Sequence, residues 1–258
     1  MIQAKFVLVT RGRTGSTAIL DELNNTAAIA TTQELFITWT FDEGLVGEVY
    51  KWAVPFDLWK RKYKLLHQIF PSLFSEEFQA SRYLSALERT ARSTRKKVFG
   101  WKLLSSHIEE REYISRLILK QGYKAIYLRR NIASQVLSGI VANHTGVYNS
   151  KSRSADLEHL RIDVEDFKSK MNWEKRCVIE DRSRLIAMGI DFVEITYEDY
   201  CKNKVKFFKS IYNFLGLRPA PLPPGTDYKK LITNPSVLIA NYRDIATAAL
   251  EMGESLEE

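Results

Sequence analysis

The feature that most constrains this chain is the alternation of short apolar runs of β-forming residues with longer segments of helical periodicity. Short apolar runs are typical of strands that are buried on both faces, and helices between such strands would cover those faces. The sequence therefore predicts an α/β fold, with a mostly parallel central sheet of about five strands flanked by helices. The expected strands are residues 5–10, 28–32, 97–103, 124–129 and 191–196, and the expected helices are residues 16–24, 113–120, 134–142, 173–188, 204–215 and 236–250.

Glycines at the ends of three expected helices support these boundaries. Gly122 and Gly189 each follow a helical pattern and come just before an apolar run, and Gly216 follows the segment 204–215. Glycine is favoured there because a helix often ends with a residue in the left-handed conformation. A second, independent signal therefore predicts the strands that follow Gly122 and Gly189.

The length and composition of the chain indicate one large domain. The chain has 258 residues, of which 45% are hydrophobic and 27% charged, and this is enough to bury a substantial core. We expect a single domain over residues 1–258, with a helical insertion at about residues 36–95 that interrupts the strand–helix alternation. Its aromatic side chains are expected either to pack between helices or to cover an active site. These aromatic residues are Trp39, Phe41, Tyr50, Trp52, Phe56, Trp59 and Tyr63.

Charge, cysteines and hydropathy narrow the class of protein. The formal net charge of +7 favours a partner that bears phosphate or sulfate. Cys177 and Cys201 cannot form a disulfide framework, and no spacing of His, Cys, Asp and Glu suits a metal, so we expect no metal. No stretch approaches the roughly 18 apolar residues of a membrane span, and the first apolar segment is too short for a signal peptide. We therefore expect a cytoplasmic protein without stable membrane insertion, whose oligomeric state the sequence does not set.

A turn rich in glycine and hydroxyl groups follows the first expected strand. Residues 10–17 read Thr-Arg-Gly-Arg-Thr-Gly-Ser-Thr and open a helix. Because a helix N-terminus offers unpaired N–H groups and a positive dipole end, phosphate is the natural ligand of such a turn. The Walker pattern of ATPases and kinases is absent, since the required Gly-Lys pair is missing, and a GxGxxG pattern fails because only Gly12 and Gly15 are present. A basic turn with an N-cap serine is the alternative interpretation.

The sequence of this turn resembles that of a known family. Residues 13–17, R-T-G-S-T, are similar to the R-S-G-S-T form of the sulfotransferase loop that binds the 5′-phosphosulfate of the donor. The residues that would contact the donor in this loop are Arg13, Thr14, Gly15, Ser16 and Thr17.

A second motif resembles the family's 3′-phosphate site. The expected strand that ends at residue 129 is followed by Arg130 and, eight residues later, by Ser138. The family has an arginine and a serine at this spacing, and it often has a proline where this chain has Ile132. A charged guanidinium and a hydroxyl can both bind the same phosphate. The resemblance therefore implies that Arg130 and Ser138 hold the 3′-phosphate of the donor.

Further segments resemble the family in the same order along the chain. Residues 197–200, Y-E-D-Y, are similar to its Y-E-D-L segment, and residues 214–217 match its F-L-G-L helix end. Residues 238–242 resemble an I-x-N-Y segment of bacterial-type members. The resemblance covers nearly the whole chain except the expected insertion, and it implies that Tyr197 lies beside the adenosine of the donor.

The resemblance implies a P-loop-NTPase-like sulfotransferase fold and a defined reaction. The enzyme would transfer a sulfuryl group from 3′-phosphoadenosine-5′-phosphosulfate (PAPS) to a hydroxyl of a carbohydrate or other small-molecule acceptor, and would release adenosine 3′,5′-bisphosphate (PAP). Arg13 would act electrostatically on the leaving phosphate, because a guanidinium cannot shuttle protons. Gly15 would allow close approach of the backbone, and Ser16 and Thr17 would bind the 5′-phosphate.

The acceptor hydroxyl also needs a general base. Glu34 is our first choice, because residues 32–36 follow the second expected strand and resemble the G-E-x-F segment of bacterial sulfotransferases that use a glutamate. His107 is the rival, since it follows the third expected strand, is similar to the catalytic histidine of cytosolic members, and titrates near neutral pH. Lys102 would either help to hold the phosphosulfate or extend along the surface.

Two other classes of protein remain as alternatives. The strand–turn–helix phosphate loop also suits a P-loop-like nucleotide kinase, although the Walker lysine is absent. The basic charge alone would suit a nucleic-acid-binding protein. The sulfotransferase interpretation instead expects a small-molecule or glycan acceptor and no nucleic acid, so binding of the donor separates the three classes.

Overall fold

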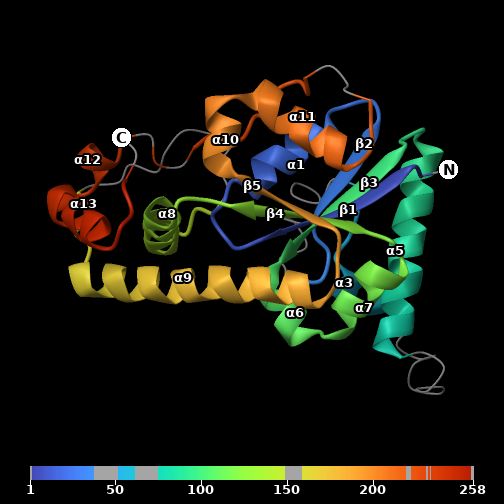
Figure 1. The fold of residues 1–258 in the computed structure, drawn as a ribbon, viewed down its shortest axis with the longest axis horizontal. Helices are drawn as coiled ribbons and strands as arrows, with labels where there is room; N and C mark the ends of the chain where they lie inside the picture. Colours follow the sequence, from blue (N-terminus) through green and yellow to red (C-terminus); the bar gives the residue numbers. More distant parts are fainter. Residues whose placement is uncertain are drawn as a thin grey trace.

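A five-stranded parallel sheet forms the centre of the protein (Figure 1). The structure is a computed structural model. It describes residues 2–37, 52–61, 75–148, 159–218, 222–230, 232 and 234–256. The strand order is β2-β3-β1-β4-β5 and each pairing is parallel, which confirms the predicted fold class. The strands are β1 (Ala4–Thr10), β2 (Ile29–Glu34), β3 (Val98–Leu104), β4 (Lys124–Arg129) and β5 (Phe192–Thr196).

Helices cover both faces of this sheet. They are α1 (Ser16–Asn24), α10 (Tyr197–Lys202) and α11 (Lys204–Phe214) on one face, and α3 (Phe56–Lys60), α5 (Glu76–Ser93), α6 (Ser105–Glu110) and α7 (Tyr113–Lys120) on the other (Figure 1). Because side chains alternate along a strand, β1 supplies both layers. Phe6 and Leu8 pack with the first group of helices, and Val7 and Val9 pack with the second.

A third cluster of helices packs beside the sheet. Its members are α8 (Ile132–Thr145), α9 (Val164–Ala187), α12 (Pro235–Leu238) and α13 (Tyr242–Glu251). They share a buried apolar cluster that includes Val141, Phe167 and Ile245. In Figure 1, α9 runs along one side of the molecule from the terminal helices to α6. Among the described helices, none combines the length and the apolar character that crossing a membrane requires.

The strand order creates a topological switch point between β1 and β4. From β1 the chain crosses by α1 to the edge strand β2, whereas from β4 it crosses by α8 and α9 to the opposite edge strand β5. In open parallel sheets, ligands bind at the carboxyl ends of neighbouring strands whose connections leave in opposite directions. The exits of β1 and β4 therefore mark the expected ligand site.

Most predicted elements form with small differences in their bounds. The first two predicted helices agree with α1 and α7, while α9 begins at Val164 rather than at residue 173. The side chain of Asp163 accepts a hydrogen bond from the third residue of this helix and caps it. The additional turns bury Phe167 and Met171, and this apolar spacing explains why the helix starts earlier.

The prediction of a single helix over residues 236–250 is wrong. The segment forms α12 and α13, because Ile239 is extended (φ −111°, ψ 113°) and forms a parallel bridge with Leu160. The side chain of Asn241 accepts from the backbone N–H of Ile162 at 3.0 Å and donates to its carbonyl oxygen at 2.8 Å. These bonds attach the segment to the chain that precedes α9, and a continuous helix could not make them.

The described part of the predicted aromatic insertion packs into the core. Phe56 is fully buried, and its ring centroid lies 5.3 Å from that of Phe36. The ring of Trp59 lies 5.3 Å from that of Tyr83 on α5, and α5 is the crossover helix between β2 and β3. Of the seven aromatic residues singled out from the sequence of the insertion, four lie outside the described residues, namely Trp39, Phe41, Tyr50 and Tyr63.

Candidate functional site

Two threonine hydroxyls fix the loop between β1 and α1. Thr10 Oγ1 donates to the carbonyl oxygen of Leu128 on β4 at 3.0 Å, and it lies 2.6 Å from Thr14 Oγ1. Both threonines are buried. The loop is therefore attached to β4, the strand that carries the second predicted motif. Thr14 holds the loop in this structure, and its contact with a donor stays a prediction.

The backbone of this loop is unusual at two positions. Arg13 and Gly15 both have left-handed conformations, with φ of 68° and 77°. At Gly15 a Cβ atom would lie 2.3 Å from the Tyr197 ring, so both the conformation and the space require glycine. A left-handed arginine is uncommon, and residues of this kind concentrate at functional sites.

The loop leads into the N-terminus of α1. Gly15 occupies the N-cap position and has no side chain, so it does not compete with an anion for the first N–H groups of the helix. Ser16 and Thr17 are the first two residues of this helix, and their side chains are largely buried. This geometry suits the predicted binding of a phosphate at Ser16 and Thr17.

The side chain of Arg13 reaches from the β1 loop to α8. Its Nε and Nη2 atoms each donate to Ser138 Oγ at 3.2 Å, and its Nη1 donates to the carbonyl oxygen of Tyr148. Since Ser138 accepts from Arg13, its own hydroxyl proton can be donated to a further acceptor. The structure therefore brings a predicted residue of the 5′-phosphosulfate loop into contact with a predicted residue of the 3′-phosphate site.

Arg130 extends the same group of residues at the exit of β4. Its Nη1 donates to the carbonyl oxygen of Arg13 at 2.9 Å, and its guanidinium lies 4.8 Å from the centroid of the Tyr197 ring. Its Nε is buried and has no hydrogen-bond partner among the described residues. The predicted residues Arg13, Ser138, Arg130 and Tyr197 thus lie together at the β1–β4 switch point.

The charges of Arg13 and Arg130 are not balanced by carboxylates in the described part of the chain. Arg11, two residues before Arg13, pairs with a glutamate at 2.6 Å, and Arg129, directly before Arg130, pairs with Glu194 at 2.5 Å. Arg13 instead has a pKa lowered by burial and by the nearby charge of Arg130. An anion bound between Arg13 and Arg130 would relieve this repulsion.

Tyr197 brings the carboxyl end of β5 into this site, beside the ends of β1 and β4. It is the first residue of α10, directly after β5, and its ring lies against Gly15 and under the guanidinium of Arg130. Burial and the neighbouring Cys201 raise the pKa of Tyr197 to about 12, so the phenol is neutral at physiological pH. A neutral ring next to two arginines offers an aromatic wall to a ligand that also carries phosphate.

Glu34 lies at the same edge of the sheet, on the other side of β1. It is the last residue of β2, and its Oε1 lies 2.6 Å from Nζ of Lys102 on β3. Both side chains are largely buried, with 17% and 9% of their surfaces exposed. The prediction did not include this ion pair, in which Lys102 holds the carboxylate in place.

His107 lies on α6, close to the end of β3. It is only 2% exposed, and its Nδ1 has no hydrogen-bond partner among the described residues. Burial lowers the pKa of His107, while the charges of Glu34 and Lys102 act on it in opposite directions. The imidazole is therefore neutral at pH 7 and can accept a proton.

Prediction from sequence missed Arg11 and its partners. Arg11 Nε donates to Glu174 Oε1 on α9 at 2.6 Å, and its Nη1 lies 3.4 Å from Asp181 Oδ2. The two acids are seven residues apart on α9 and share its buried face. Acidic residues at helical spacing within a stripe of apolar residues were the available signal, because buried carboxylates require partners.

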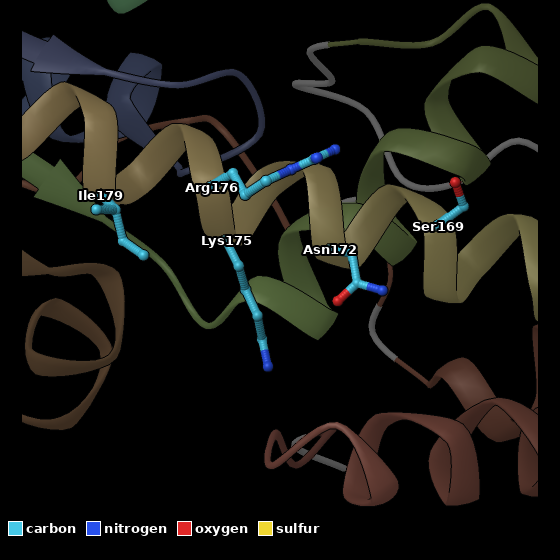
Figure 2. Close-up of a pocket in the computed structure, with 5 residues that line it drawn as sticks. All are labelled: Ser169, Asn172, Lys175, Arg176 and Ile179. Carbon is cyan, nitrogen blue, oxygen red and sulfur yellow. The ribbon is translucent and has the colours of Figure 1, made fainter.

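An open hollow of about 480 Å³ lies elsewhere, along α9 (Figure 2). Figure 2 shows that its lining residues all come from this one helix, and that Lys175 and Arg176 leave it in different directions. Lys175 donates to the carbonyl oxygen of Met252. The hollow contains none of the predicted site residues, so we do not place the site there. Its lining residues are Ser169, Asn172, Lys175, Arg176 and Ile179.

No family model matches the sequence, and no curated protein matches it. Similarity is found among solved structures. A sulfotransferase domain from the curacin biosynthetic pathway superposes with a TM-score of 0.51 and 12% identity, over 98% of this chain and 99% of that one. A sulfotransferase from Alicyclobacillus acidocaldarius has a TM-score of 0.45 and 11% identity, over 98% and 97% of the two chains.

A mouse sulfotransferase complexed with PAP is also similar, with a TM-score of 0.45 and 13% identity. That match covers 84% of this chain and 60% of the mouse protein. The likeness to the curacin-pathway domain extends over both whole chains, and it agrees with the five-stranded parallel sheet and the phosphate-loop geometry. The chain therefore has the P-loop-like fold of the sulfotransferases.

Proposed function

We propose that this protein is a cytoplasmic sulfotransferase that uses PAPS as its donor and releases PAP. Its acceptor is a hydroxyl group of a carbohydrate or another small molecule, and the reaction needs no metal. The observation that carries the proposal is the pair Arg13 and Arg130, which meet at the switch point without a carboxylate partner among the described residues. A ligand with two anionic groups on one nucleoside fits two such guanidinium groups.

In this proposal the donor spans the exits of β1, β4 and β5. The 5′-phosphosulfate lies at the N-terminus of α1, where Ser16, Thr17 and the guanidinium of Arg13 bind it. The 3′-phosphate accepts from Arg130 and from the free proton of the Ser138 hydroxyl. The adenosine lies beside Tyr197. The contacts among Arg13, Ser138, Arg130 and Tyr197 support this assignment, because they bring the four side chains together at one switch point.

The transfer step requires an in-line arrangement of three atoms. The acceptor oxygen forms a bond to sulfur while the bond between sulfur and the bridging oxygen of the 5′-phosphate breaks. The electron pair of the broken bond stays on the phosphate of PAP, and Arg13 stabilises this developing charge. The proton of the acceptor hydroxyl passes to a general base of the protein.

Glu34 is our first candidate for this base. Its carboxylate is fixed by Lys102 at the same edge of the sheet as the phosphate loop, so it would need no reorganisation before it accepts a proton. His107 remains the rival, because it is neutral and lies near the same ion pair. The two candidates can be tested separately, since Glu34→Gln and His107→Asn each remove one candidate base.

Calorimetric titration with PAP tests the donor site without knowledge of the acceptor. We expect one PAP to bind per chain in the absence of magnesium, and AMP, which lacks the 3′-phosphate, to bind more weakly. No binding of PAP at millimolar concentration would refute the proposal. Magnesium-dependent ATP turnover without PAP binding would favour a nucleotide kinase, and steeply salt-dependent binding to DNA or RNA would favour a nucleic-acid-binding protein.

Transfer itself is tested with sulfur-labelled PAPS and a panel of sugars and small alcohols. The proposal expects label in at least one acceptor, together with stoichiometric PAP. If PAP binds but label passes to none of the hydroxyl compounds, the assignment of the acceptor class is wrong, while the donor site stands.

A further inference from the structure

Arg11 carries a positive charge beside the phosphate loop, yet its side chain turns away from the loop's anion site. Its Nε donates to Glu174 Oε1 at 2.6 Å, and its Nη1 lies 3.4 Å from Asp181 Oδ2. Its guanidinium also lies 4.8 Å from the centroid of the Trp173 ring. Two carboxylates of α9 therefore balance the charge of Arg11, and it is not available to bind a phosphate.

The same guanidinium also contacts the start of α6. Arg11 Nη1 donates to Ser105 Oγ at 3.2 Å. Ser105 is 2% exposed and stands two residues before His107. It also follows β3, the strand on which Lys102 holds Glu34. Both candidate bases are thus attached to the corner where β3 meets α6.

The backbone of Arg11 belongs to the phosphate loop itself. Its carbonyl oxygen accepts from Thr14 Oγ1 at 3.2 Å, and Arg11 stands two residues before Arg13. One residue therefore connects the loop to the β3–α6 corner through hydrogen bonds at both of its ends. Gln135 of α8 supports the anchor, because its Nε2 donates to Glu174 Oε1 at 2.6 Å.

We propose that Arg11 is a positioning residue that sets the separation between the phosphate loop and the β3–α6 corner. The inference rests on the proposed function, because the donor is assigned to the loop and the base to the corner. In-line transfer depends steeply on this separation, since a displacement of about 1 Å can cost about 100-fold in rate. Arg11 therefore acts on turnover through Arg13 and the base, without touching the donor.

The test weakens the two ends of this link without removing Arg11. Replacing Arg11 would leave two buried carboxylates unpaired and could prevent folding. We choose Ser105→Ala, which removes the bond to α6, and Glu174→Gln, which weakens the anchor on α9. The matched control is Glu88→Gln. Glu88 Oε1 also accepts two hydrogen bonds, from Lys5 Nζ at 3.3 Å and from Tyr123 OH at 2.7 Å, but these lie at the opposite, amino edge of the sheet.

The first measurement is amide hydrogen exchange of the ligand-free proteins. In Ser105→Ala and Glu174→Gln we expect exchange in residues 12–15 and 105–110 to become about tenfold faster, as the loss of one hydrogen bond to a charged group implies. The control should leave both segments unchanged. Unchanged exchange in both segments of both test variants would overturn the link, and this comparison holds even if the proposed function fails.

The second measurement separates positioning from binding. We expect the Kd of PAP to stay within about threefold in both test variants, whereas sulfuryl transfer from labelled PAPS to water falls about tenfold or more. A purely structural role would lower the melting temperature of test and control variants alike without this split. A rise in the Kd of PAP as large as that in Arg13→Ala would make Arg11 part of the donor site and overturn the proposal. Absence of PAP binding in the wild-type protein would refute the proposed function instead, and the exchange rates would still decide the role of Arg11.

Discussion

The two sides of the sheet's carboxyl edge differ in how their charges are balanced. At the exits of β1 and β4, Arg13 and Arg130 meet without a carboxylate among the described residues. At the exits of β2 and β3, Glu34 and Lys102 neutralise each other at 2.6 Å. The first side has two arginines without a counter-charge among the described residues, whereas the second side holds an ion pair. The β1–β4 side therefore suits the charged donor of the proposed reaction, and the β2–β3 side suits an uncharged acceptor.

Of the changes to the β1–β4 side, replacing Arg13 should lower turnover the most. Arg13→Ala removes the charge that would stabilise the leaving phosphate, and we expect a loss of about 2 to 4 kcal/mol of transition-state stabilisation, or roughly 100- to 1000-fold in turnover. The measurement is the rate of label transfer from PAPS. Arg129→Ala is the control, because Arg129 is paired with Glu194 and should matter little. Equal rates for wild type and Arg13→Ala would contradict the comparison.

Changing Glu34 should affect the β2–β3 side in a different way. Glu34→Gln keeps the size of the side chain but removes its ability to accept a proton, so turnover should fall by about 100-fold while the Kd of PAP stays nearly constant. Label transfer and PAP titration on the same samples check this. If turnover survives in Glu34→Gln and is lost in His107→Asn, the base is His107.

The 3′-phosphate contact can be isolated by comparing two ligands. Arg130→Ala and Ser138→Ala should each weaken PAP binding, by about 1.5 to 3 kcal/mol for the charged Arg130 contact and by less for the serine. Binding of AMP should change much less, because AMP has no 3′-phosphate. Calorimetric titration with both ligands measures the difference. A parallel loss for AMP and PAP would mean that Arg130 supports the loop through the Arg13 carbonyl rather than the ligand.

The smallest expected effect is the contribution of His107 to the pH dependence of the free energy of unfolding. Its folded-state pKa is lowered by burial, so between this value and the unfolded pKa of about 6.5 the unfolded chain binds more protons. The stabilisation due to this group is therefore complete above about pH 6.5 and is lost as the pH falls through the folded pKa. Denaturant unfolding of wild type and His107→Asn at several pH values measures this. The free energy of unfolding should fall with falling pH because of this group only in wild type. An equal pH dependence in both proteins would mean that a group other than His107 causes it.

Much of the fold could be predicted because local signals agree with each other. The strand exits at Thr10 and Arg129 follow from short apolar runs, and helix bounds follow from caps and glycines. Once the strands are parallel, their carboxyl ends must meet at one edge. The grouping of Arg13, Arg130 and Tyr197 was therefore accessible from sequence order and motif alone, although their roles toward a donor are still proposals.

What could not be predicted depends on contacts between distant parts of the chain. Arg11 and Glu174 are 163 positions apart. The spacing of Glu174 and Asp181 on α9 indicates buried carboxylates that need a partner, but it does not say that the partner is Arg11. The division of the C-terminal helix likewise depends on a bridge from Ile239 to Leu160. In both cases a tertiary hydrogen bond sets the structure. It overrides the helix propensity of the C-terminal segment, and it adds a contact that local propensity does not indicate at Arg11.

A crystal structure of the protein with PAP bound would show whether a single nucleoside contacts both Arg13 and Arg130. We expect one PAP to bridge the switch point, with its 5′-phosphate at the N-terminus of α1 beside Arg13 and its 3′-phosphate on Arg130 and Ser138. PAP bound at any other place, or oriented with neither phosphate on these two arginines, would contradict it.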